Sequence, residues 1–263
     1  MKKIILLANN DVGLYNFRKE LLVALLAVPY EVHIALPYGS NVDKMEEMGC
    51  IYHETKMDRR GTNPLQELRL LKRYGTILKK VRPNVVLTYT IKPNIYGGIL
   101  CASKKIPYIT NITGLGTAVE GEGLLQKFTI AMYRFAMRKV TNLFFQNETN
   151  EQYFNKKKIA LGKHTIIPGS GVNLERYQYL EYPTTGSTEF LFISRVMKEK
   201  GIEQYIETAK IIREKYPDTV FHILGFCEDD DHKPDSYKKR LEVLEGEDII
   251  KFQGMQEDIK PYL

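Results

Sequence analysis

The chain has 263 residues, of which 43% are apolar and 27% are charged, the composition of an ordinary globular protein. Its three cysteines, Cys50, Cys101 and Cys227, are far apart and form no CxxC pair, so neither a disulfide framework nor a zinc cluster is indicated. The net charge of +6 favours anionic partners, but the sequence has no tryptophan and no RNP-like or zinc-finger pattern, which argues against nucleic acid.

Strands and helices are expected to alternate from the N-terminus. Short apolar runs rich in β-branched residues predict strands, at residues 2–8, 30–36, 50–54, 84–89, 107–112, 142–146 and 164–168. Longer runs with apolar residues three and four apart predict helices, at residues 14–28, 41–49, 64–82, 94–105, 123–140 and 148–157. This βα alternation predicts a parallel sheet with helices on both faces. The opening apolar run is too short for a signal peptide, and no run approaches a membrane span.

A segment rich in Gly, Ser, Thr, Tyr and Pro then interrupts the alternation. We expect an N-terminal Rossmann-like domain at 1–172, a linker at 173–188 and a second Rossmann-like domain at 189–263. Within this boundary the run GSGVN (169–173) favours a turn or hinge over direct contact with a ligand. The predicted elements of the second domain are strands 189–194, 219–225 and 249–253 and helices 201–215 and 235–245. Three strands are about half of a six-stranded doubly wound sheet, so the second domain is expected to be incomplete.

The run FLFISRVMKEKG (190–201) is the most informative stretch. An apolar strand ends at Ser194-Arg195, Lys198 and Lys200 follow, and Gly201 opens a helix. This order places fixed positive charge and helix-start N–H groups at the carboxyl end of a strand, where α/β sheets bind ligands. A diphosphate fits such a site, and an ordinary basic surface loop is the alternative.

Two loops of the first domain are candidates for ligand contact. After the first strand, Gly13 allows close approach of a ligand to the backbone, unless Asn10 or Asp11 simply caps the helix. After the fourth strand, Lys92 precedes Pro93, which suits a first helical turn, and the alternative is a solvated lysine. The Gly-rich run NITGLGTAVEGEG (111–123) suits a sugar or a phosphate, or is a plain flexible loop.

Other chemistries have weak support. No GxGxxG or GxxxxGK run occurs, which argues against dinucleotide dehydrogenases and P-loop NTPases. The DxD triplet within 228–231 is interpreted as a solvated acidic loop in preference to a metal site. No two histidines have metal-ligand spacing, and the mid-strand His33 and His222 are expected to be satisfied core histidines. No metal site is therefore predicted.

The predicted helix 123–140 combines apolar residues with cations. Leu125, Phe128 and Phe135 alternate with Lys127 and Arg134 along it. A basic and partly apolar face can lie on an anionic membrane. A core helix with a solvated cationic side is the alternative.

Four runs in this order resemble a known family. FLFISRVMKEKGI resembles the start of the second domain of family 4 glycosyltransferases of the GT-B fold. TIKPNIYGG, NITGLGT and PGSGVN resemble the subgroup that builds capsule, O-antigen and related bacterial polysaccharides. The resemblance implies two Rossmann-like domains around a cleft, a nucleotide-sugar donor that is commonly UDP-linked, and an undecaprenyl-diphosphate-linked saccharide as acceptor. It also implies retention of anomeric configuration without a metal or other cofactor, at the inner face of the cytoplasmic membrane.

The resemblance also assigns residues. It implies that Arg195 and Lys200 hold the donor diphosphate and act in catalysis by stabilising the leaving nucleotide. Further donor contacts are implied at Gly13, Gly225, Gln253 and Gly254. Acceptor-side positions are implied at Asn10, Lys92, Thr113 and Gly114.

The sequence departs from the family in one respect. In this family a Glu-containing loop and helix further along the second domain, with a Glu-x7-Glu pattern, contact the donor, and the sequence ends at Leu263 before that region, so a chain truncated at the C-terminus is expected. One alternative is therefore a catalytically inactive remnant that binds the acceptor or the membrane only. Another is a metal-dependent transferase that uses the DxD triplet.

Overall fold

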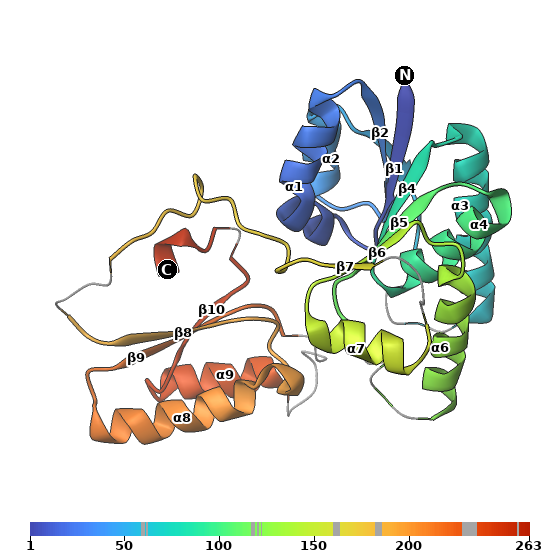
Figure 1. Ribbon diagram of the computed structural model, residues 1–263. Coiled ribbons are helices and arrows are strands. Elements are labelled where there is room, and N and C mark those ends of the chain that lie inside the picture. Colours follow the sequence, from blue (N-terminus) through green and yellow to red (C-terminus); the bar gives the residue numbers. More distant parts are fainter. Residues whose placement is uncertain are drawn as a thin grey trace. The chain divides into compact units, whose positions relative to one another are not determined.

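The computed structural model describes residues 1–263 except 59–60, 62, 117–118, 120, 122, 160–163, 182–185, 228–235 and 257. The chain forms two compact units, Met1–Val172 and Asn173–Leu263, each with its own parallel sheet (Figure 1). Repeated βα alternation is present in both, which confirms the α/β prediction.

The first unit contains a seven-stranded parallel sheet with the order β3-β2-β1-β4-β5-β6-β7. This is the doubly wound order, in which the chain reverses its direction of travel across the sheet between β1 and β4. The strands are β1 (Lys2–Leu7), β2 (Tyr30–Leu36), β3 (Ile51–Glu54), β4 (Val85–Tyr89), β5 (Tyr108–Ile112), β6 (Asn142–Phe145) and β7 (His164–Ile166).

Helices cover both faces of this sheet (Figure 1). Alternate residues of β1 point to opposite faces, so Ile4 and Leu6 pack with α1 and α2, and Ile5 and Leu7 pack with α3 and α4. The helices are α1 (Asp11–Ala27), α2 (Asn41–Glu47), α3 (Pro64–Val81), α4 (Gly98–Lys104), α6 (Leu124–Met137) and α7 (Glu148–Lys156).

Three asparagines fix where helices begin after strands or loops. The Oδ1 atom of Asn10 accepts from the Gly13 amide at 2.6 Å, which starts α1 directly after β1. Asn63 and Asn147 cap α3 and α7 in the same way. An N-cap of this kind satisfies an N–H group that otherwise has no partner in the helix. Asn10 therefore caps this helix, and the predicted contact of Gly13 with a ligand stays a prediction.

The predicted helix 94–105 is wrong at its start. A π-helical turn, η1 (Pro93–Gly97), precedes α4. Two glycines where η1 meets α4 allow close approaches, because a Cβ on Gly97 would lie 2.8 Å from Leu7 Cδ1 and one on Gly98 would lie 2.9 Å from the carbonyl oxygen of Ala136. The wide turn thus lies directly on β1 and α6.

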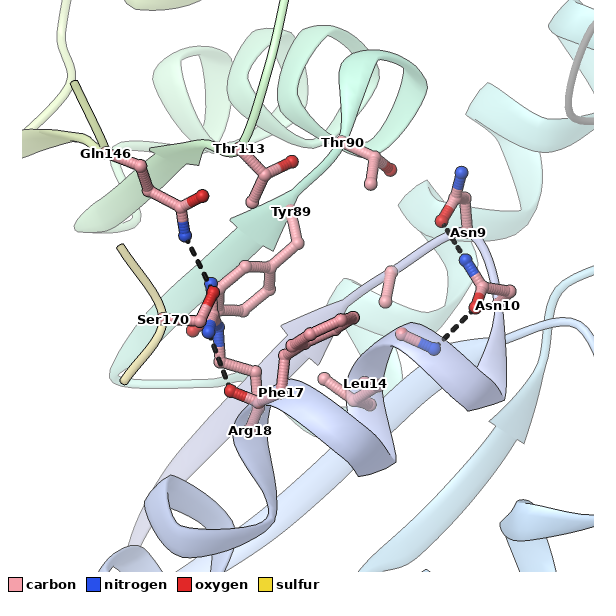
Figure 2. A pocket seen from close by; sticks show the side chains of 12 residues that line it. Asn9, Asn10, Leu14, Phe17, Arg18, Tyr89, Thr90, Thr113, Gln146 and Ser170 are labelled. Carbon is pink, nitrogen blue, oxygen red and sulfur yellow. Dashed lines mark hydrogen bonds between the residues drawn. The ribbon is translucent and has the colours of Figure 1, made fainter. Parts of the chain in front are cut away.

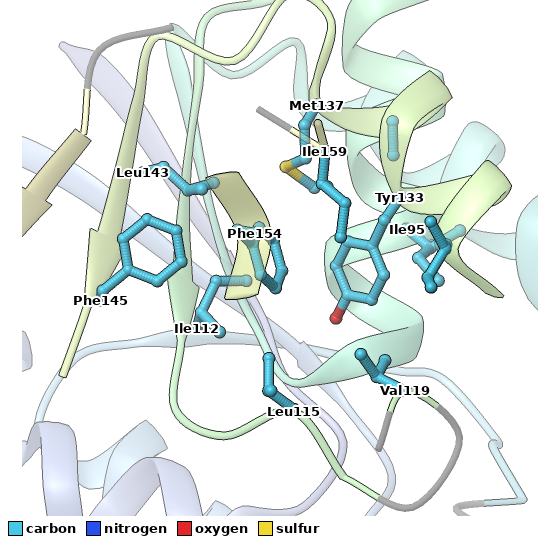
Figure 3. Packing of buried hydrophobic residues seen from close by; sticks show 12 residues of the cluster. Ile95, Ile112, Leu115, Val119, Tyr133, Met137, Leu143, Phe145, Phe154 and Ile159 are labelled. Atoms are coloured by element: carbon cyan, nitrogen blue, oxygen red, sulfur yellow. The ribbon is translucent and has the colours of Figure 1, made fainter. Parts of the chain in front are cut away.

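An aromatic cluster fixes β6 and α7 against α6 (Figure 3). Phe154 of α7 lies edge-on to Phe145 of β6, with ring centroids 5.2 Å apart, and edge-on to Tyr133 of α6 at 5.4 Å. Such pairs contribute beyond their buried area. The cluster therefore holds the carboxyl end of β6, which reaches the pocket described below.

The second unit contains a three-stranded parallel sheet of order β10-β9-β8, and α8 and α9 pack on one of its faces (Figure 1). Phe192 and Phe221 of the sheet contact Ile206 of α8 and Leu241 of α9 within one buried cluster. The elements are β8 (Glu189–Ile193), η2 (Lys198–Lys200), α8 (Ile202–Lys215), β9 (Val220–Leu224), α9 (Tyr237–Gly246), β10 (Lys251–Gly254) and η3 (Lys260–Tyr262).

Two histidines form a hydrogen-bonded pair between β2 and β3. Nδ1 of His33 lies 2.9 Å from Nε2 of His53, and Nε2 of His33 lies 2.7 Å from Oε1 of Glu31. His33 is buried and has partners at both ring nitrogens, which confirms the prediction of a satisfied core histidine. For His222 in β9 the same prediction is wrong, because the residue is only half-buried and its Nδ1 atom has no hydrogen-bond partner. Burial lowers the pKa of His33 despite Glu31. Burial, followed by repulsion from His33, Lys80 and Arg73, lowers the pKa of His53 to about 4.

We expect the first unit to lose stability as the pH falls from 6.5 to about 4. In the unfolded chain a histidine is protonated as the pH falls below 6.5, whereas His53 in the folded protein stays neutral until the pH reaches about 4. Between these two values the unfolded chain binds more protons than the folded one, so lowering the pH favours unfolding. At about 1.4 kcal/mol per pKa unit, the loss from His53 amounts to at most about 3 kcal/mol. Urea denaturation followed by circular dichroism across this interval measures it. The His53→Gln variant should show a flatter pH profile, and a wild-type stability that stays constant over the interval contradicts the expectation.

Candidate functional site

The carboxyl edge of the β8–β10 sheet brings together residues from three distant parts of the sequence. The Ser194 amide donates to the Leu224 carbonyl at 3.1 Å, and the Gly225 amide donates to the Gly254 carbonyl at 2.8 Å. The strand ends are thereby held side by side in the order β10-β9-β8. These two bonds involve Gly225 and Gly254 directly and Ser194, the residue before Arg195. The structure thus brings together three positions, Arg195, Gly225 and Gly254, that were predicted separately from the sequence. Their predicted role as donor contacts stays a prediction.

Gly225 is required by the close approach of two backbone segments. A Cβ at this position would lie 1.8 Å from the carbonyl oxygen of Ser194, and φ is +150°, a value that L side chains rarely adopt. The glycine lets the end of β9 lie directly against the end of β8. The residue that follows Ser194 is Arg195, so Gly225 contributes to the position of the arginine backbone.

The basic loop after β8 continues into a helix start without a side-chain cap. Lys200 is exposed at the end of η2, and Gly201 follows with φ of +82° as the N-cap of α8. Because glycine has no side chain, the first N–H groups of α8 receive no side-chain hydrogen bond from their cap residue. Such a helix start attracts anions. Gln253 lies in β10 at the same edge, where its carbonyl oxygen accepts from Gln256 Nε2 at 2.5 Å.

The first unit contains a pocket of about 310 Å³ at the carboxyl edge of its own sheet (Figure 2). Its walls include residues that follow β1 and β4, the two strands between which the chain reverses direction, and this switch point is where doubly wound sheets bind ligands. The lining residues are Ala8, Asn9, Asn10, Gly13, Leu14, Phe17, Arg18, Tyr89, Thr90, Thr113, Gln146 and Ser170.

Three of the residues predicted for the first domain line this pocket, and two do not. Asn10, Gly13 and Thr113 are lining residues, and Gly114 and Lys92 are not among them. Gly114 is exposed, and a Cβ there would meet nothing within 4 Å.

Lys92 is neither solvated nor turned toward the pocket. Its Nζ atom donates to the carbonyl oxygens of Asp58 at 2.6 Å and Gly61 at 2.7 Å, and to Glu67 Oε1 at 2.5 Å. Its side chain is 16% exposed. The lysine therefore connects η1 to α3 and to the segment before it, and its predicted acceptor role stays a prediction.

Sequence reasoning missed nine of the twelve lining residues, among them Phe17, Arg18, Tyr89, Gln146 and Ser170. Tyr89 and Gln146 had a usable signal, because both stand at the carboxyl ends of predicted strands. Ser170 was assigned to a turn or hinge, yet its Oγ accepts from Gln146 Nε2 at 2.9 Å at the pocket wall. Arg18 lies two helical turns into α1, and the sequence shows a cation just inside this helix but not that its side chain is buried at a pocket.

Among the described residues, no group of three or more His, Cys, Asp or Glu side chains could hold a metal ion. The DxD triplet within 228–231 lies outside the described residues. None of the helices that the structure describes is long and apolar enough to cross a membrane.

The exposed face of α6 carries large apolar side chains. Leu124 is 84% exposed, Phe128 63% and Phe135 46%. The guanidinium carbon of Arg138 lies 4.0 Å from the centroid of the Phe135 ring, and Lys127 is exposed on the same helix. Apolar surface with cations at its margin is typical of a face that contacts an anionic bilayer.

Two family models match the chain. The model described as "Glycosyl transferase 4-like" matches residues 3–147, more than half of the chain, and the model described as "Glycosyl transferases group 1" matches residues 182–263. Each match falls within one of the two units.

Individual relatives agree with these models. The chain is 22% identical over 226 residues to the N,N'-diacetylbacillosaminyl-diphospho-undecaprenol alpha-1,3-N-acetylgalactosaminyltransferase of Campylobacter jejuni, covering 80% of this chain and 60% of that relative. HepE from Anabaena, solved with UDP and glucose, aligns with a TM-score of 0.72 at 14% identity, covering 98% of this chain and 71% of HepE. Sucrose-phosphate synthase from Thermosynechococcus elongatus aligns with a TM-score of 0.70 at 16% identity, covering 97% and 71%.

These matches confirm the GT-B prediction at the level of fold. The chain spans less than two thirds of the length of the curated relatives it matches.

Proposed function

We propose that this chain, which belongs to the glycosyltransferase 4-like family, transfers a sugar from a nucleotide sugar to an acceptor carried on a lipid diphosphate. The observation that carries the proposal is the strand edge of the second unit, where Arg195, Gly225 and Gly254 come together beside the uncapped start of α8. A diphosphate is the part of a nucleotide sugar that such a group of cations and N–H donors would bind.

The donor is proposed to be UDP-linked and to carry a hexose or an N-acetylhexosamine. Support comes from two relatives, one solved with UDP and glucose and one whose name specifies an N-acetylgalactosaminyltransferase. The name of the second relative also specifies a diphospho-undecaprenol-linked substrate. We therefore propose an undecaprenyl-diphosphate-linked saccharide as the acceptor, within bacterial surface polysaccharide assembly.

In the proposed reaction the bond between the anomeric carbon and the donor phosphate oxygen breaks, and a bond from the anomeric carbon to an acceptor hydroxyl oxygen forms. The hydroxyl proton passes to the departing diphosphate. Arg195 would offer two parallel N–H donors to the developing negative charge and Lys200 a point charge. This arrangement needs no metal ion, and anomeric configuration is proposed to be retained.

The α6 face is proposed to bring the protein to the membrane that holds the acceptor. Leu124, Phe128 and Phe135 would enter the interface between headgroups and acyl chains while Lys127 and Arg138 contact anionic headgroups. The proposed location is therefore peripheral, at the inner face of the cytoplasmic membrane.

A transfer assay tests this function. The chain is incubated with radiolabelled UDP-hexose or UDP-N-acetylhexosamine and with vesicles that contain a prenyl-diphosphate-linked sugar, in the presence and absence of EDTA. We expect label to enter the lipid fraction, with or without EDTA and faster with anionic than with neutral vesicles, and NMR of the product should show the donor's anomeric configuration. Binding of UDP without any transfer would support the inactive alternative, and transfer abolished by EDTA would support a metal-dependent one.

A further inference from the structure

Arg18 is a buried cation at the wall of the first unit's pocket. It is 8% exposed, although it belongs to a surface helix, and it lies among the pocket-lining residues (Figure 2). Burying a charge in a protein is unfavourable unless a counter-charge or hydrogen bonds compensate. The contacts of the guanidinium group therefore show whether the protein itself compensates the buried charge.

The protein supplies only neutral partners to this guanidinium. Its Nη1 atom donates to the carbonyl oxygen of Phe17 at 2.6 Å, and its carbon lies 5.0 Å from the centroid of the Tyr89 ring. Among the described residues no carboxylate forms an ion pair with it. An arginine side chain has five N–H donors and keeps its charge at physiological pH. Most of its N–H donors and its full positive charge therefore remain available to a ligand in the pocket.

The acidic residues closest in sequence do not compensate this charge. Asp11 is buried but accepts from the backbone amide of Asn41 at 3.0 Å and from its Nδ2 at 3.1 Å, at the start of α2. Glu20 is exposed and stands two positions from Arg18, a spacing at which helix side chains do not face each other.

The opposite side of the pocket shows a second sign of a ligand site. Thr90 has φ of +71°, a conformation that is an outlier for a β-branched residue, and its buried Oγ1 has no hydrogen-bond partner. Such strain of about 1–3 kcal/mol persists where the surrounding structure enforces it, and it is concentrated at functional sites. Figure 2 shows Thr90 on one side of the pocket and Arg18 with Ser170 on the other.

We propose that this pocket binds a phosphoryl group, with Arg18 as its cation. The inference rests on the proposed function, because both proposed substrates carry a diphosphate. A guanidinium group matches phosphate with two parallel hydrogen bonds, and the apolar walls formed by Leu14, Phe17 and Tyr89 strengthen that attraction by excluding water. The phosphoryl group comes from the nucleotide or from the lipid diphosphate, which share this chemistry.

Binding measurements on the 263-residue chain separate the two sources. Farnesyl diphosphate serves as the lipid probe, farnesol as its uncharged counterpart, and UDP as the nucleotide probe. Arg18→Met keeps the apolar stem and removes the charge, and Lys19→Met removes a charge from the next position of the same helix as a control. Circular dichroism and thermal melting establish that the variants are folded. Arg18→Lys, which keeps the charge, provides a milder second variant.

We expect Arg18→Met to lower the affinity for farnesyl diphosphate, for UDP or for both by about 10–100-fold, the range for the loss of a hydrogen bond to a charged group. Lys19→Met should bind both probes with an affinity close to that of the wild type. Loss of farnesyl diphosphate affinity alone, with farnesol unchanged, assigns the pocket to the lipid. Loss of UDP affinity alone assigns it to the nucleotide. Unchanged affinity for both probes in folded Arg18→Met overturns the proposal. Since none of these measurements requires sugar transfer, they fail or succeed independently of the transfer assay.

Discussion

Gly225→Ala is expected to disrupt the carboxyl edge of the second unit's sheet. The new Cβ would lie 1.8 Å from the carbonyl oxygen of Ser194, so one of the two strand ends must move, and alanine disfavours φ of +150°. Overpacking against backbone and the unfavourable φ each cost about 1–3 kcal/mol, so we expect a loss of at least about 2 kcal/mol in the stability of this unit. Because the displaced segment leads into Arg195, UDP binding should also be lost.

Gly246→Ala is the matched control for this substitution. Gly246 ends α9 in the same unit, and a Cβ there meets nothing within 4 Å. Alanine is the better helix former, so this variant should be as stable as wild type or more stable by up to about 1 kcal/mol. Hydrogen exchange of peptides from β8, β9 and β10 reports the stability of this sheet. Equal protection in Gly225→Ala and wild type would show that the close approach is not structurally important.

Arg195→Ala and Lys200→Ala are each expected to weaken UDP binding by about 1.5–3 kcal/mol, or roughly 10–100-fold. Arg195 follows β8, and Lys200 ends η2 directly before the uncapped start of α8, which adds N–H donors. Neither side chain belongs to the buried cluster of this unit, so folding should persist. Isothermal titration of UDP into the wild-type and variant chains provides the comparison.

Lys210→Ala controls for the general loss of positive charge. Lys210 lies on exposed α8 and forms an ion pair with Glu207 at 3.0 Å. Surface pairs of this kind contribute little, so both stability and UDP affinity should stay near wild type. If Lys210→Ala lowers the affinity for UDP as much as Arg195→Ala does, the effect reflects net charge and the role assigned to Arg195 is wrong.

The sequence was sufficient to predict both sheets because each strand is a short apolar run that alternates with a helical pattern. Runs such as KKIILLA and FLFIS predict strands, and the segments between the strands carry their apolar residues at helical spacing, which together predict parallel sheets. Burial itself was not encoded locally, because β1 is largely buried whereas β8 is mostly exposed. The π-helical turn at Pro93–Gly97 was missed because it depends on contacts with β1 and α6, which local sequence does not encode.

The candidate sites were predictable to the extent that strand ends determine them. Arg195, Gly225 and Gly254 stand at the carboxyl ends of three strands of one sheet, so topology alone brings them together. Lys92 shows the limit of this reasoning, because its acceptor Glu67 is 25 positions away and its loop position suggested a ligand instead. Arg18 was missed for a similar reason, since only the folded structure shows that this helical arginine is buried beside Tyr89.

Hydrogen exchange with and without UDP tests the central claim most directly, because it reports where the nucleotide binds. The proposed donor site predicts that saturating UDP slows exchange in the segments that contain Ser194–Val196, Gly201–Ile202, Gly225 and Gly254, and that Arg195→Ala removes this protection. Protection confined to other segments, or none at all under conditions in which titration shows binding, would contradict the assignment of the donor site to the carboxyl edge of the β8–β10 sheet.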